Sequence, residues 1–146
     1  MHGKRPPAHE ALRTTILLAD DHAVIRSAIR ADLEELGYEV CAEVGDADAA
    51  IAAAIEHRPG ICLLDVEMPG GGGIAAAGEI AVLLPETRIV MLTVSRDDRD
   101  VVASAAAGAV GFVLKDVALD RLHAALLAVL DGEVVVPPRL RPAAAG

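Results

Sequence analysis

The sequence is poor in aromatic residues and in cysteine. One Phe, one Tyr and no Trp occur among 146 residues, so Val, Ile, Leu and Ala must fill any core. That composition suits parallel strands that are buried on both faces beneath helices. The two cysteines, Cys41 and Cys62, lie in separate apolar runs without C-x-x-C spacing. We therefore expect buried free thiols in a reducing compartment, and neither a disulfide nor a metal site.

Long apolar runs and an excess of positive charge are also missing. No run approaches the roughly 18 to 20 residues that cross a bilayer, and residues 1–15 lack the apolar centre of a signal peptide. Thirteen Lys and Arg against 22 Asp and Glu give a net charge of -9, which repels phosphate backbones. We expect a cytoplasmic, single-domain chain that makes no nucleic-acid contact through this segment.

Short apolar runs alternate with segments that have helical spacing of apolar residues. The pattern predicts strands at 15–19, 38–44, 61–64, 87–93 and 110–114, and helices at 22–36, 47–57, 74–83, 97–107 and 119–130. Five such βα units indicate an α/β fold, with a doubly wound five-stranded parallel sheet. We expect a flexible extension at 1–14, one folded domain at 15–132, and a tail or the start of an interdomain linker at 133–146.

Polar residues follow four of the predicted strands, where ligands of such sheets bind. Asp20 and Asp21 follow the first strand, Asp65 the third, Thr93 the fourth and Lys115 the fifth. Three neighbouring carboxylates repel one another unless a cation is present, and oxygen ligands favour magnesium. A carboxylate beside such an ion can attack phosphorus and form an aspartyl phosphate, whose oxygens a hydroxyl and an ammonium can bind. The set predicts phosphoryl transfer.

Simpler explanations exist for each feature taken alone. An Asp pair after a strand is often a helix cap, and residues 70–73, four glycines, are expected to form a plain loop because no G-K-[ST] follows them. His22 and His123 lack metal-ligand spacing, so we expect surface or capping roles for them. The joint placement of the acids, the hydroxyl and the lysine nevertheless favours a site.

Four segments carry a resemblance to a known family: LADDH at 18–22, LDVEMPG at 64–70, MLTVS at 91–95 and GFVLKD at 111–116. Together they resemble the receiver domains of two-component response regulators, and more narrowly those of the NarL/FixJ (LuxR-type) group. The resemblance implies the flavodoxin-like receiver fold with strand order 2-1-3-4-5. It also implies a sensor histidine kinase as partner, and control of transcription through a DNA-binding domain absent from this chain.

The resemblance also implies roles for residues at the strand ends. Asp65 would be the phosphoacceptor, and Asp20, Asp21, Asp65 and the backbone carbonyl of Glu67 would hold Mg²⁺, or Mn²⁺ in its place. Glu67 and Ser95 would border the path of hydrolytic water. Such a domain is no conventional enzyme, because it performs only self-catalysed phosphotransfer and slow autodephosphorylation.

The same resemblance implies a switch. Thr93 would supply the switch hydroxyl, Lys115 the phosphate-binding ammonium, and Phe112 the aromatic that turns inward behind the hydroxyl. Because Phe lacks the phenolic hydroxyl that many relatives have there, we expect an inward rotamer to be favoured already. The switch would reorganise the face of the fourth helix, fifth strand and fifth helix, a common dimer or partner surface. Its charged residues are expected to be Arg99, Asp100, Arg121 and His123.

Two other functions stay open at this point. A phosphatase of the haloacid-dehalogenase class also uses an aspartyl nucleophile and magnesium, but it needs D-x-D after its first strand, where this chain has adjacent acids. A pseudo-receiver would keep the fold without the chemistry, against which the complete set of five strand-end residues argues.

Overall fold

The computed structural model describes residues 14–94 and 97–137 of the chain, which form a parallel sheet with helices on both faces. The strands are β1 (Thr15–Ala19), β2 (Glu39–Val44), β3 (Ile61–Asp65), β4 (Arg88–Thr93) and β5 (Gly111–Leu114). Every neighbouring pair is parallel, and the order across the sheet is β2-β1-β3-β4-β5. The predicted fold class and strand order are confirmed.

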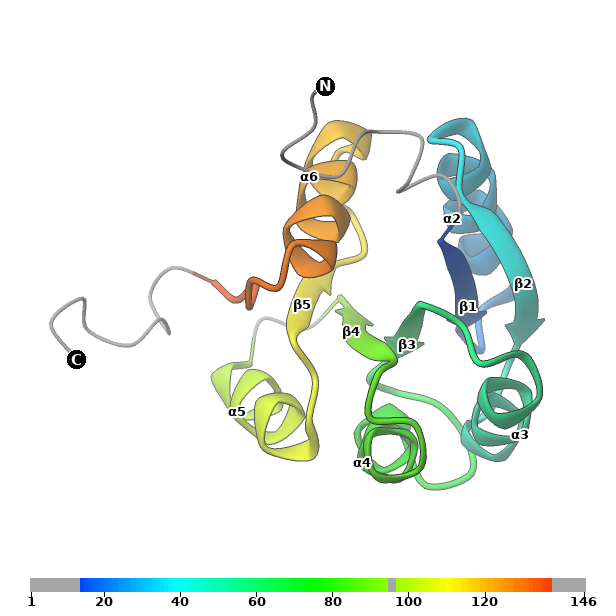
Figure 1. The fold of residues 1–146 in the computed structure, drawn as a ribbon, viewed down its shortest axis with the longest axis vertical. Coiled ribbons are helices and arrows are strands. Elements are labelled where there is room, and N and C mark those ends of the chain that lie inside the picture. The colour runs from blue at the N-terminus through cyan, green and yellow to red at the C-terminus, as the bar shows by residue number, and fades with distance from the viewer. Residues whose placement is uncertain (1–13, 95–96, 138–146) are drawn as a thin grey trace, which may run out of the picture.

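Within the described part of the chain, five helices cover the two faces of the sheet. On one face lie α2 (Ala23–Glu35) and α6 (Leu119–Leu130), and on the other lie α3 (Ala47–His57), α4 (Gly73–Leu83) and α5 (Asp98–Ala107) (Figure 1). The bounds of all ten elements differ from the predicted ones by at most one residue at either end. At α5, for example, Asp97 precedes the helix because its side chain accepts a hydrogen bond from the backbone of Arg99 and caps it.

The sheet divides the interior into two apolar clusters, because successive side chains of a strand point to opposite faces. Along β1, Leu17 and Ala19 belong to the cluster beneath α3, α4 and α5, whereas Ile16 and Leu18 belong to the cluster beneath α2 and α6. The thiols are free as expected; Cys62 is buried and Cys41 half-buried. Within the described residues, no helix has the length and apolar character needed to cross a membrane.

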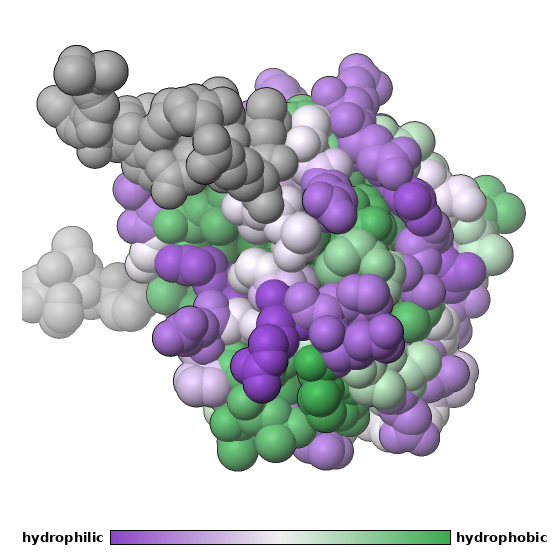
Figure 2. All heavy atoms as spheres, turned by 45° about the vertical axis from the view of Figure 1, so that its right-hand side comes forward, coloured by the Kyte–Doolittle hydropathy of each residue, from purple (hydrophilic) through white to green (hydrophobic). Residues whose placement is uncertain are grey.

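One group of exposed apolar side chains lies away from the carboxyl ends of the strands. Figure 2 shows hydrophobic surface toward the bottom of the molecule, where α3 and α4 lie, and these helices expose Ile55, Val82 and Leu83. All three residues are near the ends of their helices, which in a parallel βα unit lie at the opposite edge of the sheet from the strands' carboxyl ends.

The chain beyond α6 runs back along the edge of the sheet. Val135 forms an isolated parallel bridge with Gly111, in which the backbone N–H of Phe112 donates to Val135 and that of Val135 donates to Val110. Val135, in the segment predicted to be the tail or linker, therefore pairs with β5. Of the predicted extension at 1–14, only Thr14 is among the described residues.

Candidate functional site

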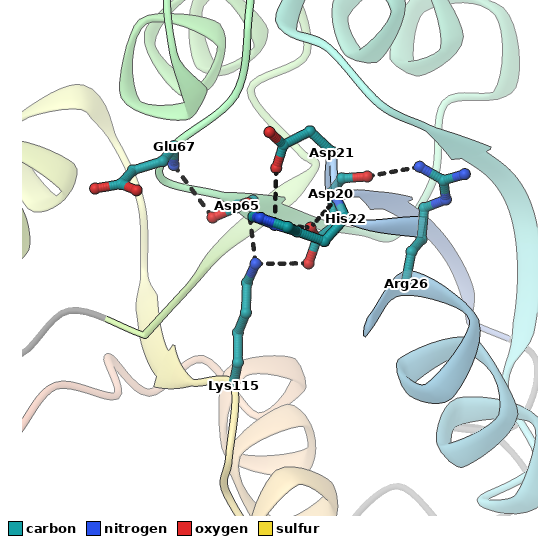
Figure 3. A network of polar contacts seen from close by, with 7 residues as sticks. All are labelled: Asp20, Asp21, His22, Arg26, Asp65, Glu67 and Lys115. Carbon is teal, nitrogen blue, oxygen red and sulfur yellow. Dashed lines mark hydrogen bonds and ion pairs between the residues drawn. The ribbon is translucent and has the colours of Figure 1, made fainter. Parts of the chain in front are cut away.

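A buried lysine lies between two buried acids at the carboxyl edge of the sheet. Asp20 follows β1, Asp65 ends β3 and Lys115 follows β5. The Lys115 ammonium donates a hydrogen bond to Asp65 Oδ2 at 2.9 Å and lies 2.7 Å from Asp20 Oδ2 (Figure 3). Because β1 and β3 are neighbours at the point where the strand order reverses, the two acids lie where such folds bind their ligands.

The backbone fixes the orientation of both carboxylates. Asp65 Oδ1 accepts a hydrogen bond from the N–H of Glu67 at 3.1 Å, and Asp20 Oδ1 accepts one from the N–H of His22 at 2.9 Å. Each acid thus uses one oxygen to close its own turn. The other oxygen of each points toward Lys115.

Of the four carboxylate oxygens of Asp20 and Asp65, one has no well-aligned hydrogen-bond donor. Asp20 Oδ2 is fully buried and has Lys115 as an ion partner, yet no donor is aligned with it for a hydrogen bond. Ligand atoms of Asp20, Asp21, His22 and Asp65 all lie within 4.8 Å of one another. Clustered carboxylates that share one ammonium, with one buried oxygen lacking an aligned donor, fit a divalent cation, which would add positive charge.

Burial and charge move the pKa values of the central pair. Burial raises the pKa of Asp65, as does the neighbouring charge of Asp20, and the hydrogen bonds from Lys115 and Glu67 oppose this only in part. Burial alone would lower the pKa of Lys115, but its contacts with Asp20 and Asp65 outweigh burial and raise it. Lys115 therefore remains charged at neutral pH and serves as counter-ion to both acids.

Thr93 and Phe112 occupy the positions that the sequence predicted. Thr93 ends β4 and is 1% exposed, and its carbonyl accepts a hydrogen bond from the N–H of Lys115 at 2.9 Å. Phe112 on β5 is 7% exposed and packs in the cluster beneath α3, α4 and α5. The expected rotamer preference of Phe112 and the switch roles of both residues stay predictions. Ser95 lies outside the described residues.

Gly73, expected to be part of a plain loop, is a close-packed position. It begins α4, its N–H donates to the carbonyl of Val66 at 2.9 Å, and a Cβ atom there would overlap the carbonyl oxygen of Asp65. Only glycine allows the helix to approach the acceptor's backbone so closely. The run of four glycines indicated the turn, but not which of them is required.

Arg26 is a second residue that the sequence analysis missed. Its Nη1 donates to the backbone carbonyl of Asp20 at 2.6 Å, and its Nε donates to Glu43 on β2 at 3.3 Å (Figure 3). The guanidinium thus ties α2 to the end of β1 and to β2. The sequence places a basic residue one helical turn after His22, which could have drawn attention to Arg26. This spacing does not show in which direction the side chain points.

His123 does not lie with the charged residues of the face formed by α5, β5 and α6, where it was expected. Its ring lies against that of Tyr38, with centroids 5.8 Å apart and planes tilted by 57°, and its Nδ1 is buried. Tyr38 belongs to the cluster beneath α2 and α6, so His123 lies against this cluster. The spacing of charged residues along α6 did not reveal this apolar contact.

Comparisons with known proteins agree with this geometry. The family model described as the response regulator receiver domain matches residues 16–127. Oxygen regulatory protein NreC of Staphylococcus epidermidis is 35% identical over 127 residues, covering 86% of this chain and 58% of NreC. The chain thus spans less than two thirds of the length of this curated relative.

Two solved structures have the same fold and recognisable sequence similarity. A LuxR-family two-component response regulator from Aurantimonas sp. has a TM-score of 0.82 at 32% identity, covering 88% of this chain and 92% of that one. The signal receiver domain of a protein designated NarL from Mycobacterium tuberculosis has a TM-score of 0.72 at 30% identity, covering 82% and 95%.

Proposed function

Since the chain belongs to the response regulator receiver domains, and within them to the NarL/LuxR type, we propose that Asp65 accepts a phosphoryl group from a sensor histidine kinase. An oxygen of Asp65 bonds to phosphorus as the bond from phosphorus to the donor's histidine nitrogen breaks. The nitrogen keeps the electron pair, and because the donor ring carries a proton on its other nitrogen during transfer, the kinase's imidazole is released neutral.

The contact between Lys115 and Asp65 carries this proposal. The ammonium is within hydrogen-bond distance of the carboxylate that would be modified, and its flexible stem allows it to pair with phosphoryl oxygens once the bond has formed. Thr93, buried at the end of the neighbouring strand, would donate its hydroxyl to another phosphoryl oxygen.

Asp20, Asp21, Asp65 and the backbone carbonyl of Glu67 would hold Mg²⁺, or Mn²⁺ in its place. An ion bound there would supply positive charge to the phosphoryl oxygens during the transfer. The buried, incompletely satisfied oxygen of Asp20 supports this assignment, because a cation would satisfy it. Glu67 itself is exposed, as expected of a residue that borders hydrolytic water.

Phosphorylation would act on the face formed by α5, β5 and α6, through Thr93 and Phe112. This face is the proposed homodimer or partner surface, and it exposes Val102 and Arg121. In the whole protein it would control a DNA-binding domain, in keeping with the regulatory names of the relatives. We place this signalling in the cytoplasm, with no nucleic-acid contact by the acidic segment itself.

Treatment with acetyl phosphate tests the proposal. The intact protein should gain one phosphoryl group in the presence of Mg²⁺ and none in EDTA, by mass spectrometry. A pseudo-receiver would gain none in either case. A haloacid-dehalogenase-like phosphatase would instead turn over p-nitrophenyl phosphate continuously, an alternative that the match to the receiver family does not favour.

A further inference from the structure

His22 directly precedes α2 but does not cap it with its side chain. It holds the N-cap position, with no side-chain hydrogen bond to the helix. Its imidazole instead turns back to the acids, where Nδ1 lies 3.1 Å from Asp21 Oδ1 and 3.5 Å from Asp20 Oδ1 (Figure 3). Of the expected surface or capping roles, His22 is at the surface, and its side chain makes no capping hydrogen bond.

Two hydrogen bonds of its backbone fix the position of His22. Its N–H donates to Asp20 Oδ1 at 2.9 Å, and its carbonyl accepts the N–H of Arg26 at 2.8 Å in the first turn of α2. The side chain is 62% exposed, so the ring is free to exchange a contact with a carboxylate for one with an incoming ion.

The spacing of the donor atoms fits ligands of one ion. With metal–ligand bonds of about 2.1 Å, neighbouring octahedral ligands are separated by about 3 Å and opposite ones by about 4 Å. The separations of 3.1 and 3.5 Å fall in this range, and one ligand atom of each residue, His22 included, lies within 4.8 Å of the others. Asp20 and Asp65 share the single ammonium of Lys115 as their buried counter-charge, so an added cation is favoured among these acids.

A nitrogen donor changes which ion such a pocket prefers. Three carboxylates alone suit hard Mg²⁺, whereas imidazole adds affinity for first-row transition ions, in the order Mn²⁺, Fe²⁺, Co²⁺, Ni²⁺. We infer that His22 is a metal ligand through Nδ1, and that the acid pocket binds a first-row transition ion more tightly than Mg²⁺. The inference rests on the proposed function only in placing a cation among these acids.

Titration calorimetry with Co²⁺ alone and with Mg²⁺ alone, at one fixed pH, tests the inference on the full chain. His22→Gln removes the nitrogen but keeps a polar side chain of similar reach. Its Co²⁺ affinity should fall by at least about tenfold, the loss that follows even from removing an outer-shell partner of a metal. Its Mg²⁺ affinity should change by less than about twofold, because magnesium prefers oxygen donors.

His57→Gln is the matched control, because His57 ends α3 at the opposite edge of the sheet and is exposed. It should leave both affinities unchanged, and other histidines contribute equally to every variant. Two results would overturn the inference: an unchanged Co²⁺ affinity in His22→Gln, or parallel losses for both ions, which would mean that His22 only orients Asp21.

Failure of the proposed function would look different. If acetyl phosphate and Mg²⁺ do not label the wild-type chain while the Co²⁺ affinity still depends on His22, the metal ligand stands and the phosphoacceptor role falls. If labelling occurs equally in the wild type and in His22→Gln while their Co²⁺ affinities agree, the phosphoacceptor role stands and His22 is not a metal ligand.

Discussion

The ammonium of Lys115 donates to the carboxylate of Asp65 at 2.9 Å across 50 residues of sequence, and both side chains are almost fully buried. Without a bound cation, this lysine is the counter-ion that makes two buried acids tolerable. The same ammonium would later bind the phosphoryl group. Stability and chemistry therefore depend on one residue.

Replacing Lys115 with Met should destabilise the metal-free protein. The change leaves Asp20 and Asp65 buried without a counter-charge, which typically costs about 3 kcal/mol of unfolding free energy. Urea denaturation in EDTA measures the loss, and Mg²⁺ should restore part of it. As control, Arg99→Met breaks an exposed pair with Asp97 and should have little effect. Equal stability of Lys115→Met and wild type would contradict the counter-ion role.

Two glycines of α4 should respond in opposite directions to alanine. Gly73→Ala puts a Cβ atom into the carbonyl of Asp65 and should lower the unfolding free energy by about 1–3 kcal/mol. Gly78→Ala meets only the Cβ atom of Ala107 at 3.9 Å, and should raise it by about 0.5–1 kcal/mol. Thermal unfolding of both variants provides the measurement. A tolerated alanine at 73 would show that α4 does not need this close approach.

Arg26→Met should weaken magnesium binding by about tenfold, since Arg26 holds the backbone of Asp20 and outer-shell contacts of this kind carry such losses. Arg30→Met is the matched control, because Arg30 on the same helix also binds Glu43 but does not contact Asp20. Calorimetry with Mg²⁺ compares the two variants. Equal affinities would mean that the contact with Asp20 does not position the acid.

The single tyrosine, Tyr38 between α2 and β2, reports at high pH how its ring packs against α6. Burial raises the pKa of Tyr38 to about 12 from an ordinary value of 10.0. Because the folded state keeps this proton longer than the unfolded state, Tyr38 contributes stability below pH 10 that is lost as the pH rises through 12.

With no Trp in the chain, the near-ultraviolet band of the phenolate measures this titration directly. The midpoint should be about 12 for the folded protein and about 10 in concentrated urea. A folded protein that titrates near 10 would show that Tyr38 is open to solvent.

Local patterns predicted the sheet, the helices and the acids well, because a buried strand and the residue that ends it are neighbours in sequence. Once the strands are parallel, topology alone brings Asp20, Asp65 and Lys115 to one edge. The directions of two side chains were missed. The sequence around His22 and Arg26 predicts the start of a helix, but it does not show that the imidazole and the guanidinium point toward the acids. The bridge between Gly111 and Val135 was missed for another reason: it pairs residues on either side of α6, without a strand-length pattern in the tail.

The central claim, that Asp65 is the phosphoacceptor, is tested most directly by intact-protein mass spectrometry of the wild type, Asp65→Asn and Asp48→Asn after treatment with acetyl phosphate and Mg²⁺. Asp48 is an exposed acid in the first turn of α3 and serves as the matched control. The wild type and Asp48→Asn should each gain one phosphoryl group, and Asp65→Asn should gain none. Labelling of Asp65→Asn to the wild-type extent would contradict the claim.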